Sequence, residues 1–152
     1  MAKWMQVKNP MSQRLLIYSD GGARGNPGPA AIAFIALNER NETVKADCCF
    51  IGVRTNNQAE YEALLFALNF ATDQKTEELV CHLDSELVAR QINGEYAVKN
   101  DQLWQLWRKV QKLKTCFKKI SFVNVPRNNL QIARADALVN KTLDDQAKKS
   151  IS

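Results

Sequence analysis

The sequence predicts an α/β fold in which helices pack on the faces of one mixed β-sheet. Two observations lead to this prediction. Short apolar runs bounded by glycine, proline or polar turns alternate with longer segments of helical periodicity. In chain order they give three strands, a helix, a strand, two helices, a strand and a final helix. The three consecutive strands favour antiparallel hairpins, whereas strands separated by helices can pair in parallel, so the sheet is expected to be mixed.

The predicted strands are short and mostly apolar. They cover residues 14–19, 30–37, 44–52, 79–83 and 119–125. The first run is too short for a helix and is followed by glycines, which favours a buried strand. The second could be helix or strand by its periodicity. Pro29 before it and the polar turn "NERNE" after it favour a hairpin partner of the first.

The predicted helices begin at polar capping residues. They cover residues 57–72, 85–92, 101–114 and 129–146. Thr55 and Gln58 have the spacing of a capping box at the start of the first helix. Leu103, Trp107 and Val110 recur at helical spacing in the third.

Length and composition are those of one soluble domain. The chain has 152 residues, of which 45% are hydrophobic and 24% charged. We expect a flexible leader over residues 1–13, a domain over 14–146 and a frayed tail over 147–152. No apolar stretch approaches the roughly 18 residues of a membrane span, and the N-terminus lacks a signal-peptide core. We therefore expect a cytoplasmic protein with no membrane partner.

Two further features of composition concern the cysteines and the charge. The four cysteines show no CxxC spacing, which favours core thiols over disulfides or metal ligands. The net charge is +5, and six of the twelve residues 108–119 are Lys or Arg. Such a cluster suits a polyanionic partner, although a solvated helix surface explains it equally well.

Two aspartates stand where apolar strand runs stop. Asp20 ends the run of residues 14–19, and Asp84 ends the run of residues 79–83. Each has an ordinary structural alternative, since Asp20 could form a turn and Asp84 could cap the following helix. If the two strands are parallel neighbours, however, these carboxylates emerge side by side.

Two more carboxylates interrupt the apolar faces of helices. Glu60 lies at the edge of the buried arc of its helix, where a capping role with Asn57 is the alternative. Asp136 lies on the apolar stripe of the last helix, one turn after Ile132. The alternatives for Asp136 are a buried ion pair, with Arg134 or Lys141, and an aspartate at a frayed edge of the helix.

Together the four carboxylates predict a metal site. Carboxylates that converge cannot all stay ionised without cations, and ligands that are all oxygen select hard divalent ions such as Mg²⁺ or Mn²⁺. On a basic protein, such a site indicates phosphodiester chemistry by two metal ions roughly 4 Å apart.

The motifs that surround these residues resemble those of type 1 ribonuclease H. They are "YSDGGARGNPGPAA", "TNNQAEYEALLFAL", "LDSELVARQI", "VKNDQLW" and "RADALVN", and the resemblance covers about residues 14–145. It implies a five-stranded mixed sheet flanked by helices. It also implies hydrolysis of the RNA strand of RNA–DNA hybrids to 5′-phosphate and 3′-hydroxyl products. The implied metal ligands are Asp20, Glu60, Asp84 and Asp136, holding two Mg²⁺ ions with the substrate, for which Mn²⁺ would substitute.

Residue-by-residue matching to the family also implies a set of substrate contacts. These are Gly21, Gly22, Asn26, Arg54, Thr55, Asn56, Asn57, Asn100, Arg127 and Asn128. Gly21 and Gly22 would let the backbone approach the substrate. Asn56 and Asn57 would contact the minor groove of the hybrid, while Thr55 and Asn100, with Arg54 as a helper, would hold a phosphate of the DNA strand.

The chain departs from the family pattern at two places. The basic protrusion of some members is replaced by the short segment "NGEYA". The loop before Asp136 also lacks the histidine of many relatives, so Arg127 or Asn128 would have to serve in its place.

Three alternatives remain beside a monomeric hybrid nuclease. The same fold could also cleave double-stranded RNA, because A-form duplexes present similar grooves and 2′-hydroxyl groups. It could be a catalytically silent module that binds hybrids, although the complete carboxylate set argues against lost turnover. A doubly wound nucleotide-binding enzyme is disfavoured because no helix follows the glycine-rich loop.

Overall fold

The structure is a computed structural model that describes residues 14–151, so the expected leader of residues 1–13 lies outside the described residues. It contains one five-stranded sheet with the strand order β3-β2-β1-β4-β5. The strands are β1 (Arg14–Ala23), β2 (Gly28–Leu37), β3 (Thr43–Arg54), β4 (Glu78–Leu83) and β5 (Lys119–Asn124). The helices are α2 (Asn56–Asp73), α3 (Glu86–Ile92), α4 (Asp101–Lys114) and α5 (Leu130–Ile151).

The sheet is mixed, as the order of elements predicts. Strands β1, β2 and β3 pair antiparallel as two successive hairpins. Strand β4 lies parallel to β1 on the other side, and β5 lies parallel to β4. The predicted fold class is therefore confirmed.

Strand β1 is longer than the sequence predicts, which changes the position of Asp20. Pairing with β4 stops at Tyr18, but pairing with β2 continues from Asp20 to Ala23. The glycines after Asp20 suggest a turn, yet the hydrogen bonds to β2 keep this backbone extended. Asp20 therefore lies within β1 rather than after it, just beyond the point where its β4 neighbour ends.

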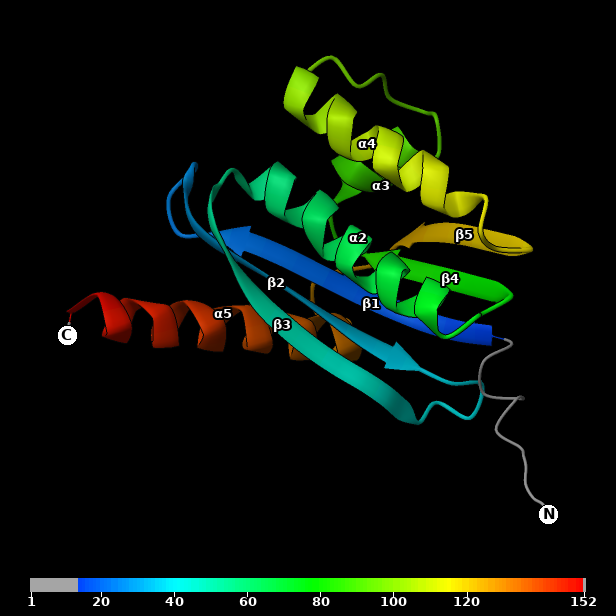
Figure 1. Ribbon diagram of the computed structural model, residues 1–152, viewed down its shortest axis with the longest axis horizontal. Coiled ribbons are helices and arrows are strands. Elements are labelled where there is room, and N and C mark those ends of the chain that lie inside the picture. The colour runs from blue at the N-terminus through cyan, green and yellow to red at the C-terminus, as the bar shows by residue number, and fades with distance from the viewer. Residues whose placement is uncertain (1–13, 152) are drawn as a thin grey trace.

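Helices cover the sheet unequally, as Figure 1 shows. Helices α2, α3 and α4 lie on one face, while α5 lies alone on the other across β1, β2 and β3. The larger core forms under α2, where Tyr61, Leu64 and Leu68 are fully buried. The smaller core lies under α5, where Val139 and Leu143 pack against alternate residues of β2. Two cores thus hold α2 and α5 against opposite faces of β1.

Two expectations about the chain need correction. Helix α5 continues to Ile151, although a frayed tail is expected from residue 147. No glycine or proline interrupts it, and Lys148 and Lys149 suit the negative end of the helix dipole. All four cysteines are free, but only Cys81 is a core thiol, because Cys49 and Cys116 are exposed and Cys48 is half-buried.

Across residues 14–151, no helix combines the length and the apolar character needed to cross a membrane.

Candidate active site

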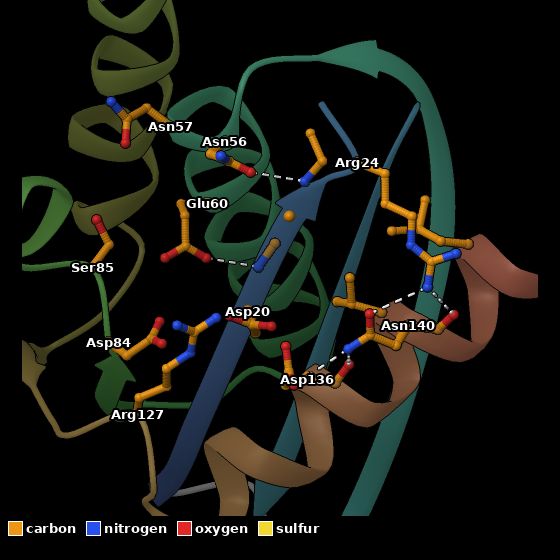
Figure 2. Close-up of a pocket in the computed structure, with 15 residues that line it drawn as sticks. Asp20, Arg24, Asn56, Asn57, Glu60, Asp84, Ser85, Arg127, Asp136 and Asn140 are labelled. Atoms are coloured by element: carbon orange, nitrogen blue, oxygen red, sulfur yellow. Dashed lines mark hydrogen bonds between the residues drawn. The ribbon is translucent and has the colours of Figure 1, made fainter. Parts of the chain in front are cut away.

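Four separate elements bring the four carboxylates into one cavity of about 470 Å³ (Figure 2). Asp20 comes from β1, Glu60 from the first turns of α2, Asp84 from the end of β4 and Asp136 from α5. The β1–β4 pairing places Asp20 beside Asp84, and the two helices on opposite faces of β1 add Glu60 and Asp136. The cavity therefore lies where β4 ends and β1 continues.

Three of these carboxylates form a tight cluster. Asp20, Glu60 and Asp84 each offer an oxygen, and these oxygens lie within 4.8 Å of one another. Asp136 is not part of this trio, but it lies close enough to Asp20 to affect its titration. The donors are all carboxylate oxygens, the ligand type that Mg²⁺ and Mn²⁺ prefer.

Burial, followed by the crowding of negative charges, raises the pKa values of Asp20 and Glu60. Burial raises the pKa of Asp20 to about 8, with smaller contributions from the charges of Asp84 and Asp136 and an opposing one from Arg127. Burial also raises the pKa of Glu60 well above its usual value, helped by the charges of Asp20 and Asp84. The site without cations therefore favours the protonated forms of Asp20 and Glu60, and bound cations would favour the ionised forms.

Glu60 is held in place by the backbone of β1. The Gly21 N–H donates to Glu60 Oε1 at 2.7 Å. A Cβ atom on Gly21 would lie 2.1 Å from the Ala59 carbonyl oxygen, whereas one on Gly22 would meet only Val139 Cγ1 at 3.8 Å. Gly21 therefore lets α2 approach β1 closely, a packing role that the sequence does not reveal. Gly22 has free space beside it in the cavity.

The structural alternatives for three of the carboxylates are wrong. Thr55, not Asn57, caps α2 in a complete capping box with Gln58, so Glu60 has no capping role. Ser85, not Asp84, caps α3 through its hydroxyl group.

For Asp136, neither expected ion pair forms, and the residue lies half-buried inside α5 and not at a frayed edge. Arg134 donates to Thr43 and Gln131, and Lys141 pairs with Asp145 at 3.0 Å. The partner of the Asp136 carboxylate is instead Asn140, whose Nδ2 donates to Oδ2 at 3.3 Å.

Five of the ten predicted substrate-contact residues line the cavity. They are Gly21, Gly22, Asn56, Asn57 and Arg127. Asn56 also ties the start of α2 to β1, because its Oδ1 accepts a hydrogen bond from the Ala23 N–H at 2.9 Å. In Figure 2 the guanidinium of Arg127 points toward the carboxylates.

The other five predicted substrate-contact residues lie outside the cavity lining, and four of them have structural roles. Asn26 accepts a hydrogen bond from the Asn56 N–H, and Arg54 forms an ion pair with Glu62 at 2.7 Å. Thr55 and Asn100 are the N-caps of α2 and α4. Asn128 is exposed in the turn before α5.

Thr55 and Asn100 belong to neighbouring helix starts. Gln58 Nε2 donates to Gln102 Oε1 at 2.7 Å, which joins the first turns of α2 and α4. Two helix N-termini side by side favour an anion, as expected for a phosphate contact.

Sequence reasoning missed three polar residues that line the cavity, namely Arg24, Ser85 and Asn140. A signal was available for Asn140, which follows Asp136 by one helical turn and so shares its face. Arg24 gave no such signal, because its partners come from the other end of the chain.

Comparisons with known proteins identify the family of this chain. The family described as reverse transcriptase-like matches residues 18–142. The ribonuclease H of Janthinobacterium sp. is 32% identical over 84% of this chain and 94% of its own length. The chain belongs to the ribonuclease H family. The resemblance noted in the motifs is thereby confirmed.

Two solved ribonuclease H structures are closely similar in fold. RNase H1 from Halobacterium salinarum has a TM-score of 0.83 at 39% identity, covering 87% of this chain and 98% of that structure. LC11-RNase H1, solved in complex with an RNA/DNA hybrid, has a TM-score of 0.79 at 40% identity, covering 91% and 99%.

Some curated relatives are longer than this chain. The chain spans 65% of the H. salinarum ribonuclease HI and 37% of a bifunctional protein from Mycobacterium tuberculosis.

Proposed function

We propose that this chain hydrolyses the RNA strand of RNA–DNA hybrids, leaving 5′-phosphate and 3′-hydroxyl ends. The observation that carries the proposal is the convergence of four carboxylates in one cavity, three of them with oxygens within 4.8 Å. The similarity to an RNase H1 solved with an RNA/DNA hybrid supports the choice of substrate.

Asp20, Glu60, Asp84 and Asp136 would hold two divalent ions, Mg²⁺ in the first place and Mn²⁺ as a substitute. The raised pKa values of Asp20 and Glu60 fit this role, because bound cations would let both groups ionise at neutral pH. Held as a pair by these four carboxylates, the ions would supply activation of a water and stabilisation of negative charge on the leaving 3′ oxygen.

The remaining residues position the substrate. Asn56 and Asn57 present amide groups at the cavity wall, where they would read the 2′-hydroxyl groups of the RNA strand. The paired helix starts at Thr55 and Asn100 would hold a phosphate of the DNA strand.

Arg127 would take over one role of the loop histidine of other family members, which is to assist at the product stage. Its guanidinium faces the carboxylates and would bind the phosphate near the cleaved bond. Arginine stays protonated at neutral pH, so Arg127 would assist product binding and not proton transfer.

We also propose that the chain acts as a monomer in the cytoplasm. All four carboxylates come from one chain, so the site needs no second copy. The four free thiols are the state that a reducing compartment maintains.

A cleavage assay tests the proposed function. End-labelled RNA–DNA, RNA–RNA and DNA–DNA duplexes are incubated with Mg²⁺, Mn²⁺ or EDTA. We expect cleavage of the RNA strand of the hybrid alone, lost in EDTA and reduced more than about 100-fold in Asp136→Asn, since even outer-shell changes cost 10–100-fold. Asp145→Asn is the matched control, because Asp145 lies on the same helix and pairs with Lys141 outside the cavity.

Other outcomes would revise the proposal. Cleavage of RNA–RNA as well would broaden the substrate to double-stranded RNA. Binding of the hybrid without cleavage in either metal would contradict the enzyme and leave a hybrid-binding module.

A further inference from the structure

A chain of polar contacts runs along one face of α5, from Asp144 back to Asp136 two turns earlier. Arg24, in the turn after β1, forms an ion pair with Asp144 at 2.7 Å through its Nη1. Its Nη2 donates to Asn140 Oδ1 and to the Asn140 carbonyl oxygen, both at 3.3 Å. Asn140 Nδ2 then donates to Asp136 Oδ2 at 3.3 Å and to the Asp136 carbonyl oxygen at 3.1 Å. Figure 2 shows Arg24 and Asn140 along this side of the cavity.

The chemistry of these groups fixes the orientation of the Asn140 amide. A guanidinium can only donate hydrogen bonds, so the amide oxygen must face Arg24. The amide nitrogen must then face Asp136, which accepts from it. The ion pair with Asp144 holds the guanidinium of Arg24 in place. The hydrogen bonds from Arg24 to Asn140 and from Asn140 to Asp136 therefore both depend on this ion pair.

Asp136 is the carboxylate that most needs such support. It is half-buried and outside the trio of Asp20, Glu60 and Asp84. The nearby cations Arg134 and Lys141 are engaged with other partners. A neutral amide orients the carboxylate and occupies one lone pair of Oδ2, yet it leaves the full negative charge for a cation.

We propose that Arg24 and Asn140 are positioning residues that orient Asp136 for its metal ion. This inference rests on the proposed function, since it assumes that Asp136 is a metal ligand. The Arg24–Asp144 pair is too exposed to contribute much stability, with side chains 44% and 60% exposed. The role of the pair is therefore to orient the side chain of Asn140 and not to stabilise the fold.

The test compares variants that break the chain at different points. Asn140→Leu removes the amide while keeping a good helix former, and Arg24→Met leaves the sequence of α5 intact. The matched control is Asp145→Asn, which removes an ion pair of α5 outside the cavity. The double variant Arg24→Met/Asn140→Leu measures whether the two residues act in series.

The first readout is metal binding without substrate. Calorimetric titration with Mn²⁺ is expected to show affinity lowered roughly 10-fold or more in Asn140→Leu, and less in Arg24→Met. Asp145→Asn should match the wild type. Because this readout needs no turnover, it tests the inference even if the chain proves not to cleave hybrids.

The second readout is the split between kcat and KM for hybrid cleavage at limiting Mg²⁺. We expect kcat to fall roughly 10–100-fold in Asn140→Leu with KM for the hybrid unchanged, and the double variant to resemble it. Excess Mg²⁺ should restore part of the rate.

Two results would overturn the inference. One is unchanged Mn²⁺ affinity and unchanged Mg²⁺ dependence in both single variants, with an active wild type. The other is a raised KM with unchanged Mn²⁺ affinity, which would make these residues direct substrate contacts. A wild type that binds Mn²⁺ but cleaves nothing would instead count against the proposed function.

Discussion

At the scale of single residues, Asp20 links the site to the stability of the fold. Its pKa is about 8 in the folded protein without metal, against an ordinary value of 3.8. A raised folded pKa means that folding favours the protonated form. The stability from this group is therefore fully present below pH 3.8 and is lost as the pH rises toward 8.

We predict that Asp20→Asn stabilises the metal-free protein at high pH. In EDTA at pH 8 the variant should melt several degrees above the wild type, at roughly 2–4 °C per kcal/mol for a domain of this size. The difference should shrink toward pH 4, and saturating Mg²⁺ should raise the melting temperature of the wild type more than that of the variant. Thermal unfolding followed by circular dichroism measures both. A difference independent of pH would show that Asp20 is not the titrating group.

Gly21 gives a second prediction at this scale. In Gly21→Ala the new Cβ would collide with the Ala59 carbonyl oxygen of α2, so the helix must move away from β1. We expect a loss of about 1–3 kcal/mol in the free energy of unfolding, as for an overpacked core. Gly22→Ala is the control, since its Cβ meets only a methyl group at an ordinary distance. Urea unfolding should separate the two variants, and equal stabilities would contradict the packing role.

At the scale of elements, the junction of α2 and α4 holds two helix caps, Thr55 and Asn100, and is also the phosphate contact that we propose. Asn100 caps α4 by accepting from the Leu103 N–H at 2.9 Å. Aspartate caps a helix as well as asparagine does, but its charge repels phosphate.

We therefore predict that Asn100→Asp keeps the melting temperature while lowering hybrid affinity about 10-fold. Asn100→Ser is the control that caps without adding charge, and it should bind nearly as the wild type does. Binding is measured by fluorescence anisotropy with a labelled hybrid in the Asp136→Asn background. Equal affinities of the two variants would leave Asn100 with a capping role alone.

The elements themselves were largely predictable because their signals are local. Periodicity and caps place the cores of every strand and helix, including the capping box at Thr55. The extension of β1 past Asp20 was not predictable, because it depends on pairing with β2 and the glycines suggest a turn. The continuation of α5 to Ile151 was missed for a related reason, since polar residues at a chain end resemble a frayed tail.

The candidate site also combines residues that the sequence predicts with contacts that it does not predict. Each of the four carboxylates interrupts a local apolar pattern, so the sequence reveals all of them. The contacts among side chains depend on tertiary structure, such as the pairing of Arg54 with Glu62 and that of Arg24 with Asn140, which lies 116 residues away. No local pattern could show that Gly21 meets the backbone of α2.

At the scale of the whole molecule, the question is whether the basic charge of α4 serves hybrid binding. Arg108, Lys109 and Lys112 are exposed on this helix, which starts beside α2 at Asn100 and lies in the outer layer in Figure 1. If the hybrid extends from the carboxylates across α4, these side chains would contact its phosphates and release counterions. If α4 presents only a solvated surface, these side chains neither contact phosphates nor release counterions.

We predict that removing an α4 cation that contacts a phosphate lowers the salt dependence of hybrid binding. Arg108→Gln and Lys112→Gln should each reduce the slope of log affinity against log salt by about 1. Arg40→Gln is the matched control, since it makes the same charge change in the exposed turn between β2 and β3. Anisotropy titrations over a series of salt concentrations, again in the Asp136→Asn background, give the slopes. If all three variants share the wild-type slope, the basic cluster is a solvated surface, and the hybrid is held by the cavity and the α2–α4 junction alone.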